Sequence, residues 1–67
     1  QGKTGQAIDY FEKAIAYNPN ALVPYLELGR LYNERNEGDK AKEYFKKYLE
    51  LGGDKSKVTA LSKKNGD

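Results

Sequence analysis

The sequence contains an internal repeat with a period of 34 residues, and this feature restricts the possible folds more than any other. The segment from Asp9 to Asn20 reads DYFEKAIAYNPN, and the segment from Glu43 to Asp54 reads EYFKKYLELGGD. One unit of such a repeat cannot bury its own apolar face, so neighbouring units have to stack. We therefore expect a short stack of similar units within these 67 residues.

Each copy of the repeat shows the spacing of an amphipathic helix. Apolar residues in the first copy recur three and four positions apart, which is typical of one helix face. We predict a first helix from Gln6 to Tyr17, with Gly2 and Gly5 in the turn before it. Asn-Pro-Asn at 18–20 should end this helix, because the residue before a proline avoids helical backbone angles. The apolar face consists of Ala7, Ile8, Phe11, Ala14 and Ile15.

A second helix is predicted to begin at Ala21 or Leu22, with Asn20 as its N-cap. It should end near Arg35, because Asn36 and Gly38 tolerate the left-handed conformation that closes many helices. Its buried stripe is predicted to be Tyr25, Leu28, Leu31 and Tyr32.

A third helix is predicted to begin at Asp39 as N-cap and to end at Gly52-Gly53. Asp54 or Ser56 could cap a last short helix. The third helix should bury Ala41, Tyr44, Phe45, Tyr48 and Leu49, and the last helix has only Val58, Ala60 and Leu61 as apolar residues.

The composition excludes several classes of site. The chain has no cysteine and no histidine, so disulfides, thiolate metal sites and the commonest general base are absent. We predict no catalytic residues, no metal ligands and no cofactor. The first residue is Gln, and we expect the chain to be a piece of a longer protein. No segment suggests membrane insertion or targeting, and the compartment stays unknown, with the cytoplasm as the default.

A helix–turn–helix period of 34 residues resembles the tetratricopeptide repeat. The family's pattern is matched in the unit from Leu22 to Lys55 and in an earlier half-unit. The resemblance implies an all-α solenoid of antiparallel helices, with three main helices and a short C-terminal capping helix. It divides the domain 1–67 into the second half of a repeat (1–20), a complete repeat (21–53), a capping helix (54–64) and a disordered tail (65–67). The matching residues are Tyr25, Leu28, Gly29, Tyr32, Ala41 and Phe45, preceded by Ala7, Phe11, Ala14 and Pro19.

Two departures from the pattern suggest that no ordinary repeat follows. The second copy has Tyr48 where the first has Ala14, and it has Gly53 where the first has Pro19. The family's small residue at the first of these positions lets the next repeat approach. The lysine-rich last helix is therefore interpreted as a polar cap.

The resemblance also implies a function, namely non-catalytic binding of a partner protein in a concave groove. The partner would be a peptide or a helix, and the chain would act as a scaffold or adaptor. The groove residues carried over from the family are Val23, Leu26, Arg30, Asn33 and Glu34. One subclass of the family grips C-terminal carboxylates, but Leu26, Glu27 and Arg30 differ from its clamp, so that activity is not expected.

Two alternatives remain open. The chain could form homo-oligomers through an uncovered first helix, with Ile8, Phe11 and Ile15 as the contact. Nucleic-acid binding is less favoured. Residues 38–67 contain eight basic and five acidic residues, and Lys55, Lys57, Lys63 and Lys64 have no acid between them.

Overall fold

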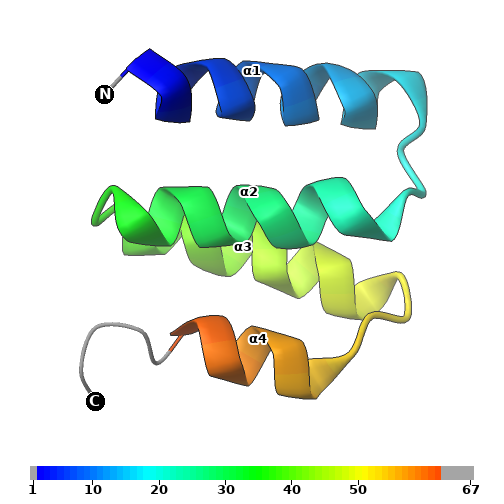
Figure 1. Ribbon diagram of the computed structural model, residues 1–67. Coiled ribbons are helices and arrows are strands. Elements are labelled where there is room, and N and C mark those ends of the chain that lie inside the picture. Colours follow the sequence, from blue (N-terminus) through cyan, green and yellow to red (C-terminus); the bar gives the residue numbers. More distant parts are fainter. Residues whose placement is uncertain (1, 63–67) are drawn as a thin grey trace.

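The computed structural model describes residues 2–62, and these residues form four α-helices (Figure 1). They are α1 (Gly2–Tyr17), α2 (Leu22–Glu34), α3 (Gly38–Glu50) and α4 (Lys55–Ser62). Consecutive helices run antiparallel, and α2 lies centrally in contact with the other three (Figure 1). The predicted all-α architecture of three main helices and a short last one is confirmed. The predicted tail at 65–67 lies outside the described residues.

The start of α1 differs from the sequence prediction. The helix begins at Gly2, four residues before Gln6, so Gly2 and Gly5 are helical and do not form a turn. A glycine in a helix costs only about 1 kcal/mol relative to alanine, and no proline precedes Gln6. The two glycines were therefore too weak a signal to end the helix.

The connection between α1 and α2 corrects one predicted cap. The N-cap of α2 is Ala21, with extended backbone angles (φ −74°, ψ 126°) and no side-chain hydrogen bond, so the prediction of Asn20 was wrong. The backbone N–H of Asn20 instead donates to Asn18 Oδ1 at 3.2 Å. The Tyr25 hydroxyl donates to the Pro19 carbonyl at 2.8 Å, which ties α2 to this turn.

The end of α2 is a Schellman motif closed by an asparagine. Asn36 has a φ of 62°, as predicted, and its N–H donates to the Asn33 carbonyl at 3.1 Å. The N–H of Glu37 donates to the Tyr32 carbonyl at 2.9 Å. The chain enters α3 at Gly38, so of the two residues that tolerate the left-handed conformation only Asn36 adopts it, and Gly38 is helical.

The structure contradicts the predicted N-cap of α3 and agrees with one of those proposed for α4. The N-cap of α3 is Glu37, and Asp39 lies inside the first turn, so that predicted cap was wrong. In contrast, α4 is capped by Asp54, one of the two residues proposed for that position. Its Oδ1 accepts the N–H of Ser56 at 2.9 Å and the hydroxyl of Ser56 at 2.8 Å. These hydrogen bonds from Ser56 lower the pKa of Asp54.

The core is formed where α1 and α3 meet the two sides of α2. The ring of Phe45 lies against Gly29, because no side chain at that position separates the two helices. Tyr44 and Leu49 were predicted on the buried stripe, but Tyr44 is half-buried and Leu49 is exposed. The core cluster consists of Ile8, Leu28, Leu31, Tyr32, Ala41 and Phe45.

Tyr48 shapes the connection to α4. Its buried ring packs on Gly53, and its hydroxyl accepts the N–H of Asp54 at 3.1 Å. The tyrosine that replaces a small residue of the first copy therefore holds the α3–α4 turn. Within residues 2–62, no helix has the length and apolar character needed to cross a membrane.

Candidate functional site

The five predicted groove residues all lie on α2, on the side of the helix opposite its buried stripe. We call this surface the α2 outer face, comprising Val23, Leu26, Arg30, Asn33 and Glu34. Helical spacing of three and four residues brings them onto one side. Val23 is 62% exposed, whereas Leu26 is half-buried and packs against the core cluster. The apolar part of this face therefore consists of an exposed valine and a leucine whose side chain is partly buried against the core.

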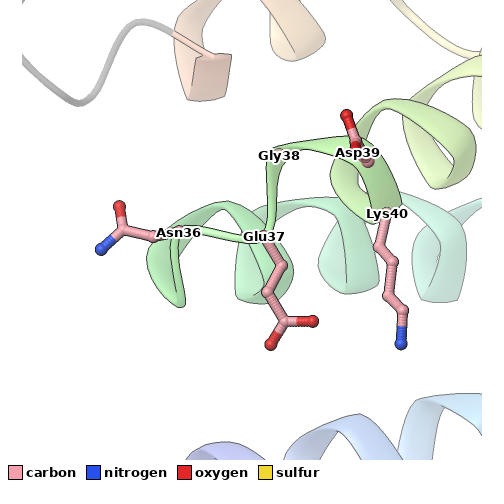
Figure 2. Close-up of a pocket in the computed structure, with 5 residues that line it drawn as sticks. All are labelled: Asn36, Glu37, Gly38, Asp39 and Lys40. Carbon is pink, nitrogen blue, oxygen red and sulfur yellow. The ribbon is translucent and has the colours of Figure 1, made fainter.

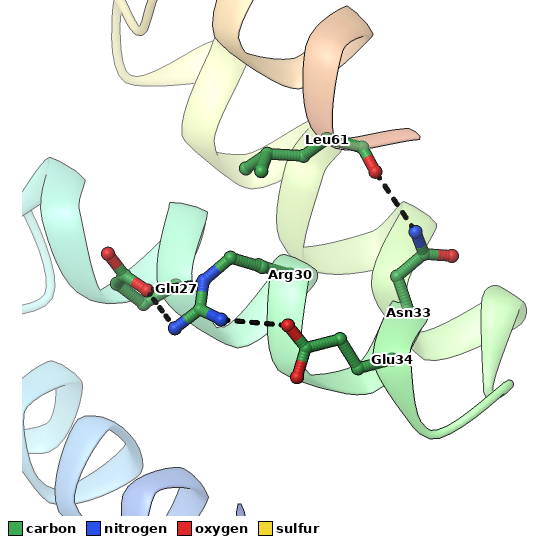
Figure 3. Close-up of polar contacts among 5 residues, drawn as sticks. All are labelled: Glu27, Arg30, Asn33, Glu34 and Leu61. Atoms are coloured by element: carbon green, nitrogen blue, oxygen red, sulfur yellow. Dashed lines mark hydrogen bonds and ion pairs between the residues drawn. The ribbon is translucent and has the colours of Figure 1, made fainter. Parts of the chain in front are cut away.

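Arg30 is held by two glutamates of its own helix (Figure 3). Its Nε donates to Glu27 Oε1 at 2.8 Å, and its Nη1 donates to Glu34 Oε2 at 2.9 Å. The hydrogen bond with Glu27 raises the pKa of Arg30, and the charges of both glutamates add to this effect. Arg30, one of the predicted groove residues, thus already has two carboxylates of this chain around it.

Glu27, which forms an ion pair with Arg30, was not among the predicted site residues. Glu27 lies three positions before Arg30, a spacing at which opposite charges on a helix meet, so the pair could have been found from the sequence. Glu27, Arg30 and Glu34 together carry one net negative charge. This part of the α2 outer face is therefore acidic.

Asn33 contacts another helix. Its Nδ2 donates to the backbone carbonyl of Leu61 at 3.1 Å, at the end of α4 (Figure 3). The last carbonyls of a helix lack partners within the helix, so this bond satisfies one of them. This hydrogen bond links α4 to α2, and it leaves the side-chain carbonyl oxygen of Asn33 as the part of the amide that this bond does not use.

The residues predicted for self-association lie on the core side of α1. Ile8 is buried in the core cluster, and Phe11 and Ile15 are half-buried and pack against it. The helix α2 packs on this side of α1, so Ile8 is covered, while Phe11 and Ile15 stay partly exposed, and their role in self-association stays a prediction. The exposed aromatic residues of α1 are instead Tyr10, at 68%, and Tyr17, at 93%.

The lysines considered for nucleic-acid binding lie only partly within the described residues. Lys55 and Lys57 are exposed on α4, while Lys63 and Lys64 lie outside the described residues. Most tyrosines that could stack on bases are packed in the fold. Tyr32 and Tyr44, for example, stack on each other with ring centroids 5.6 Å apart.

Two shallow hollows occur on the described surface. One, of about 400 Å³, is lined by the five consecutive residues 36–40. Figure 2 shows that Glu37 and Lys40 extend in one direction while Asn36 and Asp39 point elsewhere, so the four side chains do not converge on a ligand. The other, of about 520 Å³, lies between α3 and α4 with Phe45, Leu49 and Val58 in its lining. Neither encloses a set of groups suited to acid–base chemistry.

The described residues contain no cluster of three or more acidic, histidine or cysteine side chains that could hold a metal ion. No buried side-chain nitrogen or oxygen atom in the described part lacks a hydrogen-bond partner. The polar groups of residues 2–62 are thus accounted for by exposed positions and by bonds within the chain.

Comparison with known proteins identifies the repeat. A family model described as tetratricopeptide repeat matches residues 1–64. No curated protein and no solved structure matches the chain. The helix pairs, the 34-residue period and this match over nearly the whole sequence lead to one conclusion: the chain belongs to the tetratricopeptide repeat family.

Proposed function

We propose that the chain binds a segment of a partner protein on the α2 outer face. Membership of the tetratricopeptide repeat family implies a protein-interaction module in general, and repeats of this family are typically non-catalytic. The observation that carries the proposal is the exposure of Val23, at 62%, on the face of α2 that α3 does not cover. An exposed aliphatic side chain beside a half-buried one offers apolar area that a partner could remove from water.

The charges of this face suggest the chemistry of the partner. Arg30 is already neutralised by Glu27, so Glu34, which is exposed, carries the excess charge. A partner with a lysine or arginine next to an apolar residue would match this arrangement. The apolar residue would pack on Val23 and Leu26, and the basic group would join the glutamates around Arg30. Asn33 would contribute through its carbonyl oxygen, since its amide nitrogen is bonded to Leu61.

Selection of peptides provides a direct test. A random peptide library displayed on phage would be selected against the immobilised 67-residue chain. Binding of the selected peptides would then be measured by isothermal titration calorimetry with wild type and two variants. Val23→Asp places a charge in the centre of the α2 outer face. Tyr10→Asp places the same charge at a similarly exposed position of α1 and is the matched control.

We expect Val23→Asp to weaken binding by about tenfold or more, because it puts a charge against the apolar part of the peptide. Tyr10→Asp should bind as wild type does. The selected peptides should be enriched in lysine or arginine beside an apolar residue. Peptides that bind Val23→Asp as tightly as wild type would show that the α2 outer face is not the binding surface.

A further inference from the structure

The larger of the two hollows lies between α3 and α4, and we call it the α3–α4 groove. Its lining includes Lys42, Phe45, Lys46, Leu49 and Glu50 of α3 and Val58 of α4. Spacings of three and four residues place the α3 members on one side of that helix. Phe45 is buried and Val58 is half-buried, whereas Leu49 is 37% exposed. The groove therefore combines apolar side chains, one of them still partly in water, with charged ones.

The internal repeat shows what this side of a helix packs against in the first copy. The α1 residues 34 positions before Lys42, Phe45 and Leu49 are Ile8, Phe11 and Ile15. They belong to the core cluster or pack against it, and α2, with 13 residues, lies on their side of α1. The helix that follows α3 is α4, which has only 8 residues, none of them buried. This side of α3 is thus a helix-packing surface that a shorter helix occupies.

The charges on this side differ between the two copies. Glu12 of α1 accepts a hydrogen bond from the Tyr32 hydroxyl of α2 at 3.2 Å, whereas the equivalent residue of α3 is Lys46. Lys42 and Lys46 are both exposed, and among residues 2–62 neither forms an ion pair, not even with Glu50. Two lysines and one glutamate give the lining a net charge of +1. The groove therefore offers positive charge that α4 does not neutralise.

We propose that the α3–α4 groove binds an acidic amphipathic helix of a partner protein. Apolar residues of that helix would pack on Leu49 and Val58, and its aspartates or glutamates would lie beside the two lysines. Lys42 and Lys46 are four positions apart, which is about one helical turn. Carboxylates one turn apart on a helix alongside α3 would therefore face both lysines. This charge pattern selects an acidic partner and disfavours a basic one.

The size of the groove predicts weak binding. The 8 residues of α4 extend over about 12 Å, so the contact spans about two turns of the partner helix. Stable complexes bury about 800 Å² on each partner, which is more than two turns can supply. We therefore expect a dissociation constant of about 100 µM.

A synthetic peptide of defined chemistry tests the proposal. The glutamate peptide has leucines three and four positions apart and glutamates on its other faces, and a side-chain cross-link holds it helical. In the lysine peptide, lysine replaces every glutamate. In NMR titrations of the isotope-labelled chain, the glutamate peptide should shift the amide signals of Leu49 and Val58 and leave that of Val23 unchanged. The lysine peptide should not shift the signals of Leu49 and Val58.

Two neighbouring lysines provide matched variants. Lys46→Glu reverses a charge in the lining, and Lys47→Glu makes the same change at the next residue, which is also exposed but not part of the lining. Lys46→Glu should weaken binding of the glutamate peptide by about tenfold, because attraction becomes repulsion at close range. Lys47→Glu should weaken it by less than about threefold, because solvent and salt screen the more distant charge.

Three results would overturn the proposal. The first is a glutamate peptide that leaves the signals of Leu49 and Val58 unchanged, including the case in which the chain binds vesicles of anionic lipid instead. The second is an equal loss of affinity in Lys46→Glu and Lys47→Glu, which would mean that only net charge attracts the peptide. The third is a shift of the same signals with chain concentration when no peptide is present, because a second copy would then be the occupant.

This proposal and the one for the α2 outer face can fail separately. Val23→Asp is expected to lose the peptides selected from the library and to keep the glutamate peptide, and Lys46→Glu is expected to do the reverse. Both positions are exposed, so neither change should disturb the core, and circular dichroism shows whether helicity is unchanged.

Discussion

The ring of Phe45 lies so close to Gly29 that a Cβ atom at Gly29 would come closer than 3.0 Å to three carbons of the ring. Gly29 is in the interior of α2, and Phe45 is a buried residue of α3. A glycine that weakens its own helix is thus the position at which the two central helices touch. The contact explains why this helix contains a residue with poor helix propensity.

Gly29→Ala should therefore destabilise the chain, although alanine favours helix. The change gains about 1 kcal/mol in helix propensity, but overpacking a core typically costs about 1–3 kcal/mol. We expect a lower midpoint in urea unfolding followed by circular dichroism. Gly5→Ala is the matched control in α1, where a Cβ would meet no atom within 4 Å, and it should be stabilising. If both substitutions stabilise the chain, the Phe45 ring can make room for a Cβ atom at Gly29 and the prediction is wrong.

Asn36→Ala should lower stability by about 1 kcal/mol, since residues other than glycine, asparagine and aspartate rarely adopt the left-handed conformation. Asn36 holds that conformation, with a φ of 62°, at the end of α2. Asn36→Gly should be neutral or slightly stabilising. Thermal unfolding of both variants checks the prediction, and equal melting temperatures for alanine and glycine would contradict it.

Stability should fall between pH 10 and pH 12 through the ionisation of Tyr44. Burial, followed by the charge of Glu12, raises the pKa of Tyr44 from 10.0 to about 12. The unfolded chain therefore loses this proton at lower pH than the folded chain does. The stabilising contribution is complete below pH 10 and is lost as the pH rises through 12.

Denaturant unfolding at a series of alkaline pH values would measure this loss. Tyr44→Phe should show a shallower decline than wild type. Glu12→Gln should lower the pKa of Tyr44 in an absorbance titration, since the Tyr44 hydroxyl donates to Glu12 Oε2 at 3.4 Å. Identical pH profiles for wild type and Tyr44→Phe would show that another group is responsible.

Asn33→Ala should loosen α4 without unfolding the rest of the chain. The substitution removes the bond from Asn33 Nδ2 to the Leu61 carbonyl, and α4 has no buried residues of its own to compensate. A lost hydrogen bond of this kind is worth about 1 kcal/mol. Hydrogen exchange followed by NMR should show faster exchange of the α4 amides and unchanged exchange in the core of α3. Unchanged protection of α4 would mean that other contacts hold it.

The positions of the helices could be predicted because several independent signals agree on them. The breaker at 18–20, the glycines at 52–53 and the apolar stripes all fall in one 34-residue register. The N-cap predictions that failed depend on single polar residues. Asparagine and aspartate are favoured at N-caps, which led to the choice of Asn20 and Asp39. The N-cap positions are instead occupied by Ala21 and Glu37. Which neighbouring residue becomes the cap is decided by backbone angles that composition does not determine.

The candidate site could be predicted in outline and not in detail. The spacing of α2 places Val23 and Arg30 on one face, as expected from the resemblance. Whether Arg30 is free depends on side-chain geometry, because the spacing makes a pair with Glu27 possible and the structure shows that the pair is formed. The apolar pattern of α1 placed Ile8 on the buried side and Tyr10 off it, but how completely α2 covers Ile8 depends on packing that the pattern does not determine.

The central position of α2 has a consequence for the evolution of this sequence. Because α2 contacts the three other helices, most substitutions along it would disturb packing on one side or another. Val23 is an exception, being largely exposed in the first turn of the helix. A new partner preference could therefore arise through replacement of this one residue at little cost in stability. The buried residues of the helix would be retained by selection for folding.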